Sequence, residues 1–514
     1  MFQRKRQPVS QPAGDEPCQL DGDPLIQWGE VPLPASDATA GFVAFGAPGS
    51  GKSIMLQLLE QSVLPRIPAG NDMRALVYDA KGDATSRLAA VCPHVERRNS
   101  NPFDQRGWAW NMCADIREPR VAVEIGFTLI PETHESQPFF SDAARAWLIG
   151  VMLSFMLTGA DWTFGDLVRV LKSERRIKAV LKRHPQTRDI IEQYFSRHDQ
   201  RLVANIMSTV ATKLLRFEPV AAAWDTATNR FSLEDWIKEN WILILGNSEA
   251  SRIPIDAINR CMFRRSVDLL LGQSESFTRQ TWYFLDEVTE IGGRLPNLVS
   301  LMKKGRSKGG CVAMAMQSIS ALRDQSNYGQ YFASEILGQI ANRWIGRLEC
   351  VDTAEFLSRL IGDQERTVVH ESFTSGKNGN STTTSKHLET RRLVMPSELM
   401  SIDECNYENG ISGYHVMRSI GTFKANIPSD QLFDELLIPR DASVPDFVPR
   451  PSEAQFLRPW TKDDTRRFIG RRIPKCPSRD RDEERRDRRR RRPKHKRDRD
   501  TRDDEKKRDN DRQA

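Results

Sequence analysis

The stretch GFVAFGAPGSGKSIMLQLLE, residues 41–60, decides the fold. It contains the pattern G-x-x-x-x-G-K-S from Gly46 to Ser53, preceded by the apolar run 42–45 and followed by a segment with helical apolar spacing. This order predicts a strand, a phosphate-binding loop and a helix. Glycines allow backbone conformations that a side chain would block, and the free N–H groups of a helix N-terminus attract anions. The chain is therefore interpreted as a nucleotide-binding protein.

The loop residues are Gly46, Ala47, Pro48, Gly49, Ser50, Gly51, Lys52 and Ser53. We expect them to bind ATP as cofactor, with Lys52 reaching the β- and γ-phosphates and the Ser53 hydroxyl ligating Mg²⁺. The alternative is a plain glycine-rich turn, which the flanking strand and helix patterns disfavour.

A second motif is TWYFLDE, residues 281–287, in which an apolar strand ends in two carboxylates. Next to a phosphate-binding loop, Asp286 is expected to hold Mg²⁺ and Glu287 to polarise the attacking water. A strand that simply ends at a turn would show the same pattern. A glutamate base indicates hydrolysis by water rather than transfer to a second substrate.

Further candidates lie near the ends of predicted strands. Gln317 ends the strand CVAMAMQ and is expected to contact the γ-phosphate and the water, unless it is merely a polar strand end. Arg306 lies in the basic turn KKGRSKGG, which in a ring would present it to a neighbour's ATP or, alternatively, to DNA phosphates. Asp79 and Lys81 follow the strand of residues 74–78 and have either a direct role or a role in a turn salt bridge.

Charge and cysteine content limit the class of protein. The net charge is +7, but residues 478–514 hold 18 basic and 12 acidic residues, so the remaining chain is close to neutral. The eight cysteines include no C-x-x-C pair, which is typical of a reduced cytoplasmic protein without zinc. The longest apolar stretch, residues 146–160, is shorter than the ~20 residues of a bilayer span and predicts a buried helix.

The pattern along the chain predicts an α/β protein with a parallel sheet. Residues 1–24 are predicted to be a disordered N-terminus, 25–162 the first part of the nucleotide-binding domain, 163–239 an inserted all-α domain, 240–437 the second part, and 438–514 a linker and charged disordered tail. The Ser/Thr/Gly/Asn-rich residues 372–385 are expected to form a mobile surface loop or a hairpin tip. The arginine-rich residues 485–499 are expected to bind nucleic acid weakly; the alternatives are a solvated tail and binding to a protein partner.

These motifs together resemble the type IV coupling proteins of conjugative DNA transfer, of the TraD/TraG type. The resemblance covers roughly residues 25–430 and rests on GEVPLP, GAPGSGKS, YDAKGD, NPFD, WNMCADI, FFSDAARAWL, FLDEVTEIGGRLPNLVSLMKKGRSKGG, MQS and RLVMPSELM. It implies a RecA-like P-loop domain with an inserted all-α domain, a hexamer around a central channel, and ATP-driven movement of DNA through it. We expect the DNA to be single-stranded and bound without sequence preference. It also implies a relaxase and secretion-channel ATPases or membrane subunits as partners, and supports Gln317 as sensor and Arg306 as arginine finger.

One departure is that coupling proteins usually begin with membrane-spanning helices, whereas only 45 residues precede the loop here and none of them is expected to span. We therefore expect a cytoplasmic protein, held at the inner face of the membrane, if at all, through a partner. Two other functions stay open: a soluble hexameric helicase or segregation pump, and an ATP-dependent docking adaptor for protein substrates.

Overall fold

The computed structural model describes residues 7–8, 25–68, 72–132, 138–195, 200–289, 291, 293–325, 327–376 and 379–470. The predicted disordered N-terminus, apart from Gln7–Pro8, and the charged tail beyond residue 470 lie outside these residues. The chain divides into a unit that ends at Pro459 and a second unit that begins at Trp460. The described part of the second unit contains helix α18 (Lys462–Phe468), which starts with a capping box between Thr461 and Asp464.

A ten-stranded sheet is the centre of the first unit as described, with strand order β1-β16-β15-β12-β4-β11-β10-β5-β9-β6. The strands from β12 to β6 are parallel, and β15, β16 and β1 extend the sheet in antiparallel fashion. Their bounds are Gln7–Pro8 (β1), Phe42–Phe45 (β4), Met73–Tyr78 (β5), Arg97–Asn99 (β6), Ile242–Leu245 (β9), Gln280–Leu285 (β10), Gly310–Met316 (β11), Asn342–Ile345 (β12), Ile411–Met417 (β15) and Gly421–Ile427 (β16).

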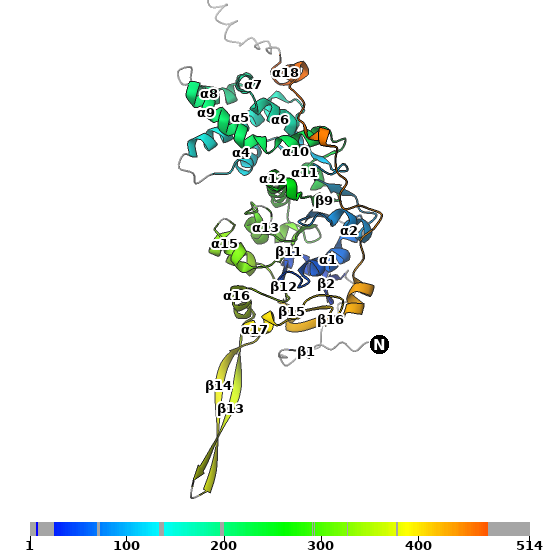
Figure 1. Cartoon of the computed structure of the whole chain (residues 1–514), viewed down its shortest axis with the longest axis vertical. Coiled ribbons are helices and arrows are strands. Elements are labelled where there is room, and N and C mark those ends of the chain that lie inside the picture. Colours follow the sequence, from blue (N-terminus) through cyan, green and yellow to red (C-terminus); the bar gives the residue numbers. More distant parts are fainter. Residues whose placement is uncertain are drawn as a thin grey trace, which may run out of the picture. The chain divides into compact units, whose positions relative to one another are not determined.

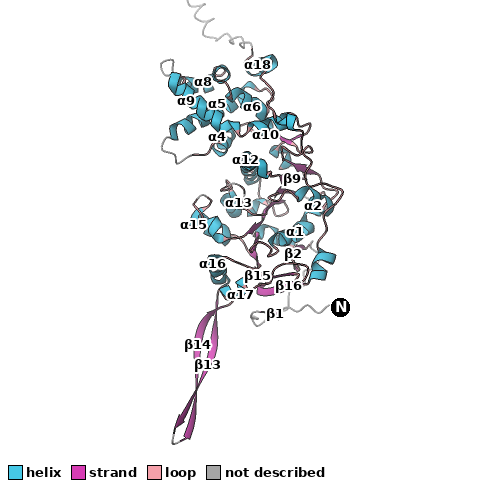
Figure 2. Ribbon diagram, viewed as in Figure 1, coloured by secondary structure: helices cyan, strands magenta, loops and turns pink. Residues whose placement is uncertain are grey.

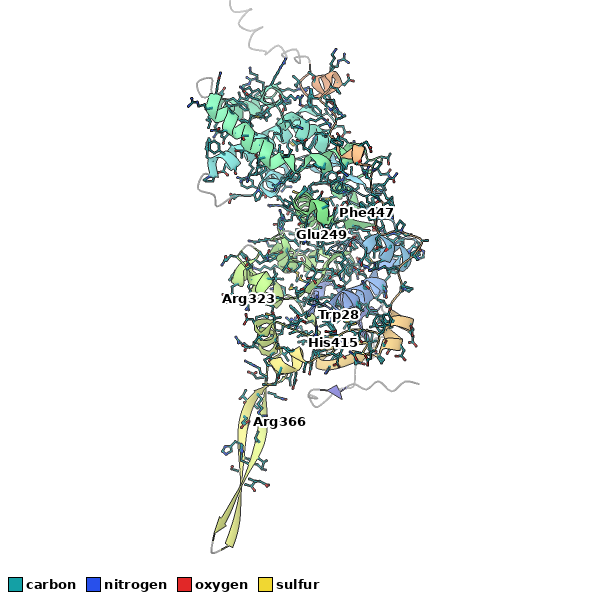
Figure 3. The ribbon with its side chains drawn as sticks, in the orientation of Figure 1. Trp28, Glu249, Arg323, Arg366, His415 and Phe447 are labelled. Atoms are coloured by element: carbon teal, nitrogen blue, oxygen red, sulfur yellow. The ribbon has the colours of Figure 1, made fainter. Side chains whose placement is uncertain are left out.

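The central strands are apolar on both faces because helices cover the parallel sheet on both sides. Trp28 packs against Phe42, which packs in turn against Trp282, and all three side chains are fully buried. Figure 3 labels Trp28 and His415 within this domain. Its other elements are β2 (Ile26–Trp28), β3 (Val31–Leu33), α1 (Lys52–Val63), α2 (Ala84–Val91), α3 (Met112–Asp115), α11 (Leu233–Trp236), α12 (Arg252–Leu271), α13 (Leu298–Lys304), α14 (Ile319–Arg323), α15 (Gly329–Gly338), α16 (Val351–Ile361) and α17 (Pro396–Met400).

A group of helices interrupts the α/β pattern (Figure 2). It consists of α4 (Pro119–Leu129), α5 (Pro138–Thr158), α6 (Phe164–Leu171), α7 (Glu174–Leu181), α8 (Pro185–Tyr194), α9 (Gln200–Leu215) and α10 (Glu218–Asp225). Helix α5 contacts α4, α6, α7, α8 and α9 and so forms the centre of the group. A short parallel pair, β7 (Ala109–Trp110) with β8 (Arg230–Phe231), lies where the chain enters and leaves it.

The boundaries of this insert differ from the predicted 163–239. Helices α4 and α5 belong to the insert but precede residue 163. Helix α5 is apolar on most of its surface, so it lacks the charged helical pattern from which the bounds 163–239 were predicted. At the other end, the Trp236 indole donates to Ala75 O on β5 and the Arg74 guanidinium donates to Glu239 O. Trp236 and Glu239 are therefore bound to β5 of the sheet, outside the group of helices α4 to α10.

Helix α5 is also the one helix in the described ranges that is long and apolar enough to cross a membrane. It has 21 residues, more than the predicted apolar stretch, and 61% of its most apolar window is buried inside the molecule. A core helix meets the same test of length and composition, so the finding is weak evidence for a membrane span.

A long hairpin extends from the end of α16 (Figure 1). Strands β13 (Asp363–Gly376) and β14 (Gly379–Arg392) pair in register from Asp363↔Arg392 to Gly376↔Gly379. The predicted loop at residues 372–385 is thus the outer part of this hairpin, because its threonines suit a strand as well as a loop. Arg366 is labelled on β13 in Figure 3.

The residues expected to form a linker make specific contacts instead. We call residues 438–459 the C-terminal strap; Figure 1 shows it in orange, running beside α2 and on to α10. The Arg440 guanidinium lies 2.6 Å from the Asp83 carboxylate next to α2, and the Gln105 amide donates to Val448 O. Arg450 donates to Pro102 O and to the Thr226 hydroxyl beside α10. The strap therefore connects the sheet domain with the helical insert.

Candidate nucleotide-binding site

The glycine-rich loop joins β4 to α1, as the sequence predicts. Gly49 and Gly51 have φ angles of 75° and 94°, in the left-handed region that favours glycine. A Cβ on Gly46 would lie 2.1 Å from Ser50 Oγ, which has no hydrogen-bond partner among the described residues. The Ala47 amide donates to Arg347 O after β12, so the loop is tied to the neighbouring strand end. The loop thus has the compact backbone that a phosphate cradle requires.

Three predicted site residues meet behind the loop. Lys52 Nζ lies 3.3 Å from Glu287 Oε1 and donates to Ala47 O, also at 3.3 Å. Gln317 Nε2 donates to the same Glu287 oxygen at 3.0 Å. They meet because β4, β11 and β10 are adjacent parallel strands whose carboxyl ends share one edge of the sheet.

Glu287 itself has a strained backbone. Its φ of 58° places a non-glycine residue in the left-handed region, which costs on the order of 1 kcal/mol or more. The side chain is nearly fully buried. Strain of this kind persists only where the surroundings hold the residue in place, and here it turns the carboxylate toward Lys52 and Gln317.

A second cluster lies at the start of α1. The Ser53 hydroxyl donates to Asp286 Oδ2 at 2.9 Å, so the two predicted metal ligands are adjacent. Asp286 Oδ1 is buried and has no hydrogen-bond partner in the part of the chain that the structure describes. An unpaired carboxylate oxygen beside a hydroxyl fits a hard divalent cation such as Mg²⁺. Lys81 Nζ also reaches this cluster, 2.5 Å from Ser53 Oγ and 3.5 Å from Asp286 Oδ2.

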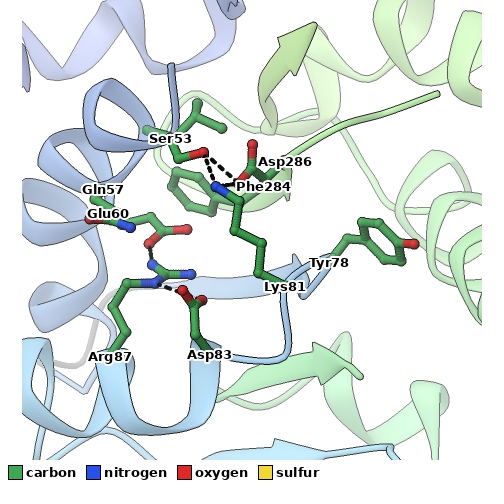
Figure 4. Close-up of a pocket in the computed structure, with 10 residues that line it drawn as sticks. Ser53, Gln57, Glu60, Tyr78, Lys81, Asp83, Arg87, Phe284 and Asp286 are labelled. Atoms are coloured by element: carbon green, nitrogen blue, oxygen red, sulfur yellow. Dashed lines mark hydrogen bonds and ion pairs between the residues drawn. The ribbon is translucent and has the colours of Figure 1, made fainter. Parts of the chain in front are cut away.

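This cluster forms one wall of a pocket between α1 and the end of β5 (Figure 4). On the opposite wall, Arg87 forms ion pairs with Glu60 of α1 and with Asp83. Burial lowers the pKa of Arg87 to about 10, so it still carries its positive charge at neutral pH. The lining is Ser53, Leu56, Gln57, Glu60, Tyr78, Lys81, Asp83, Arg87, Phe284 and Asp286.

Asp79 lies in the turn that follows β5, and its carboxylate is bound by the backbone of that turn. Its Oδ1 accepts from the amides of Gly82 at 2.8 Å and Asp83 at 3.0 Å, and its Oδ2 accepts from the Ala84 amide at 3.2 Å. Burial, with a contribution from the Asp83 charge, raises the pKa of Asp79 to about 7. The sequence left the roles of Asp79 and Lys81 open. In the structure Asp79 stabilises the turn, and Lys81 reaches Ser53 and Asp286.

Arg306 does not join the site of its own chain. It is exposed in a 3₁₀ turn, Arg306–Lys308, that precedes β11. Gln317 follows the other end of β11, and seven strand residues span about 20 Å. Arg306 therefore lies at the opposite edge of the sheet from Glu287, and any contact with a nucleotide would have to be made to another copy of the chain.

The Glu60–Arg87 pair and the link from Asp83 to the strap were not predicted from the sequence. Glu60 ends the stretch of residues 41–60, and its charge falls on the apolar face of the predicted helix. A charge at such a position indicates a buried ion-pair partner, and this was the signal in the sequence. Nothing in the local sequence pairs Arg440 with Asp83, which is 357 residues away.

The fold and the site define a P-loop nucleotide-binding protein of the RecA-like class with an all-α insert. Residues 25–417 match the family described as type IV secretion-system coupling protein DNA-binding domain. The chain belongs to this family of coupling proteins, which confirms the resemblance seen in the sequence.

Relatives and solved structures agree with this assignment. The coupling protein TraD of Escherichia coli K12 is 24% identical over 395 residues, which are 74% of this chain and 52% of TraD. The conjugal transfer protein TraG of Rhizobium radiobacter is 31% identical over 123 residues, 24% of this chain and 19% of TraG. The chain thus spans about half the length of TraD.

Among solved structures, the coupling protein TrwBdeltaN70 in its unbound monoclinic form has a TM-score of 0.61 at 18% identity, covering 84% of this chain and 92% of its own. TrwB in complex with ADP and Mg²⁺ has the same TM-score and identity and covers 84% and 94%. These likenesses confirm the predicted fold class.

Proposed function

We propose that this chain is an ATP- and Mg²⁺-dependent DNA-translocating ATPase that couples a relaxase–DNA complex to a type IV secretion channel. The observation that carries the proposal is the meeting of Lys52, Glu287 and Gln317 beside the Ser53–Asp286 pair, in a chain of the coupling-protein family. The complexes of TrwB with ADP and Mg²⁺ and with a non-hydrolysable ATP analogue support the choice of cofactors.

The binding step uses the loop from Gly46 to Ser53. Its amides and Lys52 would hold the phosphates, and Ser53 and Asp286 would hold Mg²⁺. The metal, when bound, neutralises negative charge on the phosphates. The buried and unpaired Asp286 Oδ1 supports this assignment because it offers a ligand oxygen that nothing else in the described chain uses.

The hydrolytic step falls to Glu287. Its carboxylate would accept a proton from the attacking water, and Gln317 would orient this carboxylate through the 3.0 Å hydrogen bond. A phosphate would take over the Lys52 ammonium that now pairs with Glu287, which would leave the carboxylate free to act as base. The Lys52 and Glu287 side chains lie away from bulk solvent, which strengthens the electrostatic interaction between them.

The proposed active form is a homohexamer. The exposed position of Arg306, at the opposite edge of the sheet from Glu287, supports a role in the site of a neighbouring copy. An arginine finger supplied in this way accelerates phosphoryl transfer by about 10³- to 10⁵-fold in known systems.

The proposed substrate is DNA, because the matching family is described as a DNA-binding domain. We propose that the DNA is single-stranded and bound without sequence preference. The helical insert would receive the relaxase–DNA complex. Secretion-channel ATPases or membrane subunits complete the set of partners, and the chain would act in the cytoplasm at the inner face of the membrane.

Steady-state ATP hydrolysis tests the proposal. Rates are measured without DNA, with single-stranded DNA and with duplex DNA, at low and moderate salt, and with Lys52→Ala as the inactive control. Stimulation by DNA that is lost in Lys52→Ala is the expected result. Hydrolysis that ignores DNA would refute translocation and favour a docking adaptor for protein substrates.

A further inference from the structure

The turn after β5 is built to present one lysine. Its sequence is Asp79-Ala80-Lys81-Gly82-Asp83, and the Asp79 carboxylate accepts the amides of Gly82, Asp83 and Ala84. Gly82 has a φ of 76°, which lets the chain reverse within this turn. The three hydrogen bonds fix the backbone on the C-terminal side of Lys81 and leave the Lys81 side chain to point outward from the turn.

The Lys81 side chain crosses the pocket toward α1 and the end of β10 (Figure 4). Its ammonium donates to Ser53 Oγ at 2.5 Å and lies 3.5 Å from Asp286 Oδ2. These are the two groups assigned to the metal. An ammonium and a divalent cation repel each other, so they cannot share these two oxygens without a compensating negative charge.

A phosphate is the group that supplies this charge. A lysine can bind a phosphate oxygen as a point charge while the metal takes the hydroxyl and the carboxylate. The side chain is long and 52% exposed, whereas Lys52 is almost fully buried behind the loop, so Lys81 is the one of the two with room to move.

We propose that Lys81 is a second phosphate-binding lysine of this site, which leaves Ser53 and Asp286 for the metal when it pairs with the terminal phosphate of a nucleoside triphosphate. The inference rests on the proposed function, since it requires the site to bind nucleotide and Mg²⁺. It assigns to Lys81 a share of the distinction between triphosphate and diphosphate, in addition to the phosphate contact of Lys52.

Competition between nucleotides tests the proposal. A fluorescent ADP derivative is displaced from the full-length chain by ADP or by a non-hydrolysable ATP analogue, each in excess Mg²⁺, and the ratio of the two affinities is compared between variants. Lys81→Gln should lower the preference for the triphosphate by about three- to tenfold, since the lost contact is charge-assisted but half-exposed. Lys81→Arg keeps the charge and should retain most of the preference.

A matched control is Lys172→Gln. Lys172 is 47% exposed and pairs with the Glu218 carboxylate in the helical insert, away from the pocket. It should leave the affinity ratio unchanged. An unchanged ratio in Lys81→Gln, or an equal change in Lys172→Gln, would overturn the proposal.

Two further outcomes separate the possible failures. If Lys81→Arg lost as much preference as Lys81→Gln, the turn rather than the charge would be responsible, and the proposal would be wrong. If the unmodified chain bound the fluorescent nucleotide and Lys52→Ala did not, the binding part of the proposed function would stand whatever Lys81 does. Absence of binding by the unmodified chain would refute both.

Discussion

Glu287→Gln should have two effects of opposite sign. The variant keeps the size of the side chain and an oxygen that can accept from Gln317, but it removes the negative charge next to Lys52. Turnover should fall by about 10²- to 10⁴-fold, the usual contribution of a general base. Nucleotide affinity should rise, because Lys52 would no longer be partly neutralised by an ion pair.

The gain in affinity can be bounded from the geometry. At 3.3 Å and an effective dielectric constant near 20, the attraction between Lys52 and Glu287 is about 5 kcal/mol. Phosphate binding removes only part of it, since the carboxylate stays nearby and Gln317 continues to stabilise it. A third of this value, about 1.7 kcal/mol, corresponds to roughly 15-fold tighter binding.

The assay is titration of a fluorescent nucleotide together with steady-state hydrolysis on the same preparation. Glu349→Gln is the matched control: its carboxylate pairs with Arg347 near the loop but lies outside the Lys52 cluster, so neither quantity should move. If Glu287→Gln kept its turnover, or if it bound nucleotide more weakly than the parent chain, the assignment of Glu287 as a base paired with Lys52 would be refuted.

Three further predictions address the turn, the strap and the ring. The raised pKa of Asp79 means that the folded state binds the proton of this carboxyl more tightly than the unfolded state does. Protonation therefore stabilises the fold fully below about pH 4, and this contribution is lost as the pH rises through about 7. The change in the free energy of unfolding between pH 4 and 8, measured by denaturation, should therefore be smaller in Asp79→Asn by up to about 4 kcal/mol. An unchanged pH dependence in this variant would contradict the raised pKa. Arg450→Ala should lower the free energy of unfolding by about 3 kcal/mol, because the buried guanidinium donates to the carbonyls of Pro102 and Asp104 and both would lose a charge-assisted partner. Arg450→Lys should recover only part of this stability. A loss below about 1 kcal/mol in Arg450→Ala would contradict the proposed role of the strap contacts. Arg306→Ala should bind nucleotide normally, but its turnover should fall by at least about 10³-fold. Mixing it with Lys52→Ala should restore part of the rate, since a mixed ring contains sites in which Lys52 of one copy and Arg306 of the next are both intact. No recovery on mixing would rule out an arginine finger supplied by a neighbouring copy.

Much of the site follows from sequence because its parts are local motifs. The run 42–45, the glycines and Lys52 occur in one short stretch, and Asp286 with Glu287 directly follows an apolar strand. Parallel strands place their carboxyl ends at one edge, so the convergence of these motifs with Gln317 requires no knowledge of distant contacts.

Other features depend on contacts between residues far apart in sequence. The strap reads as a proline-containing linker, and only its pairing with Asp83, Pro102 and Thr226 shows that it is held in place. The predicted insert left out helix α5. This helix is apolar on several sides because other helices of the insert pack around it, so its sequence lacks the charged pattern of its neighbours. The threonine-rich hairpin reads as a loop because its strands have no apolar face to bury, so the alternation that marks a strand is missing.

Hydrolysis at this site is proposed to move DNA. The most direct measurement is ATP-dependent displacement of streptavidin from a biotinylated single strand, with the full-length chain, with Lys52→Ala and with Glu287→Gln. The unmodified chain should displace streptavidin when ATP and Mg²⁺ are present, and neither variant should displace it. Hydrolysis that DNA stimulates but that displaces no streptavidin from either end of the strand would contradict it.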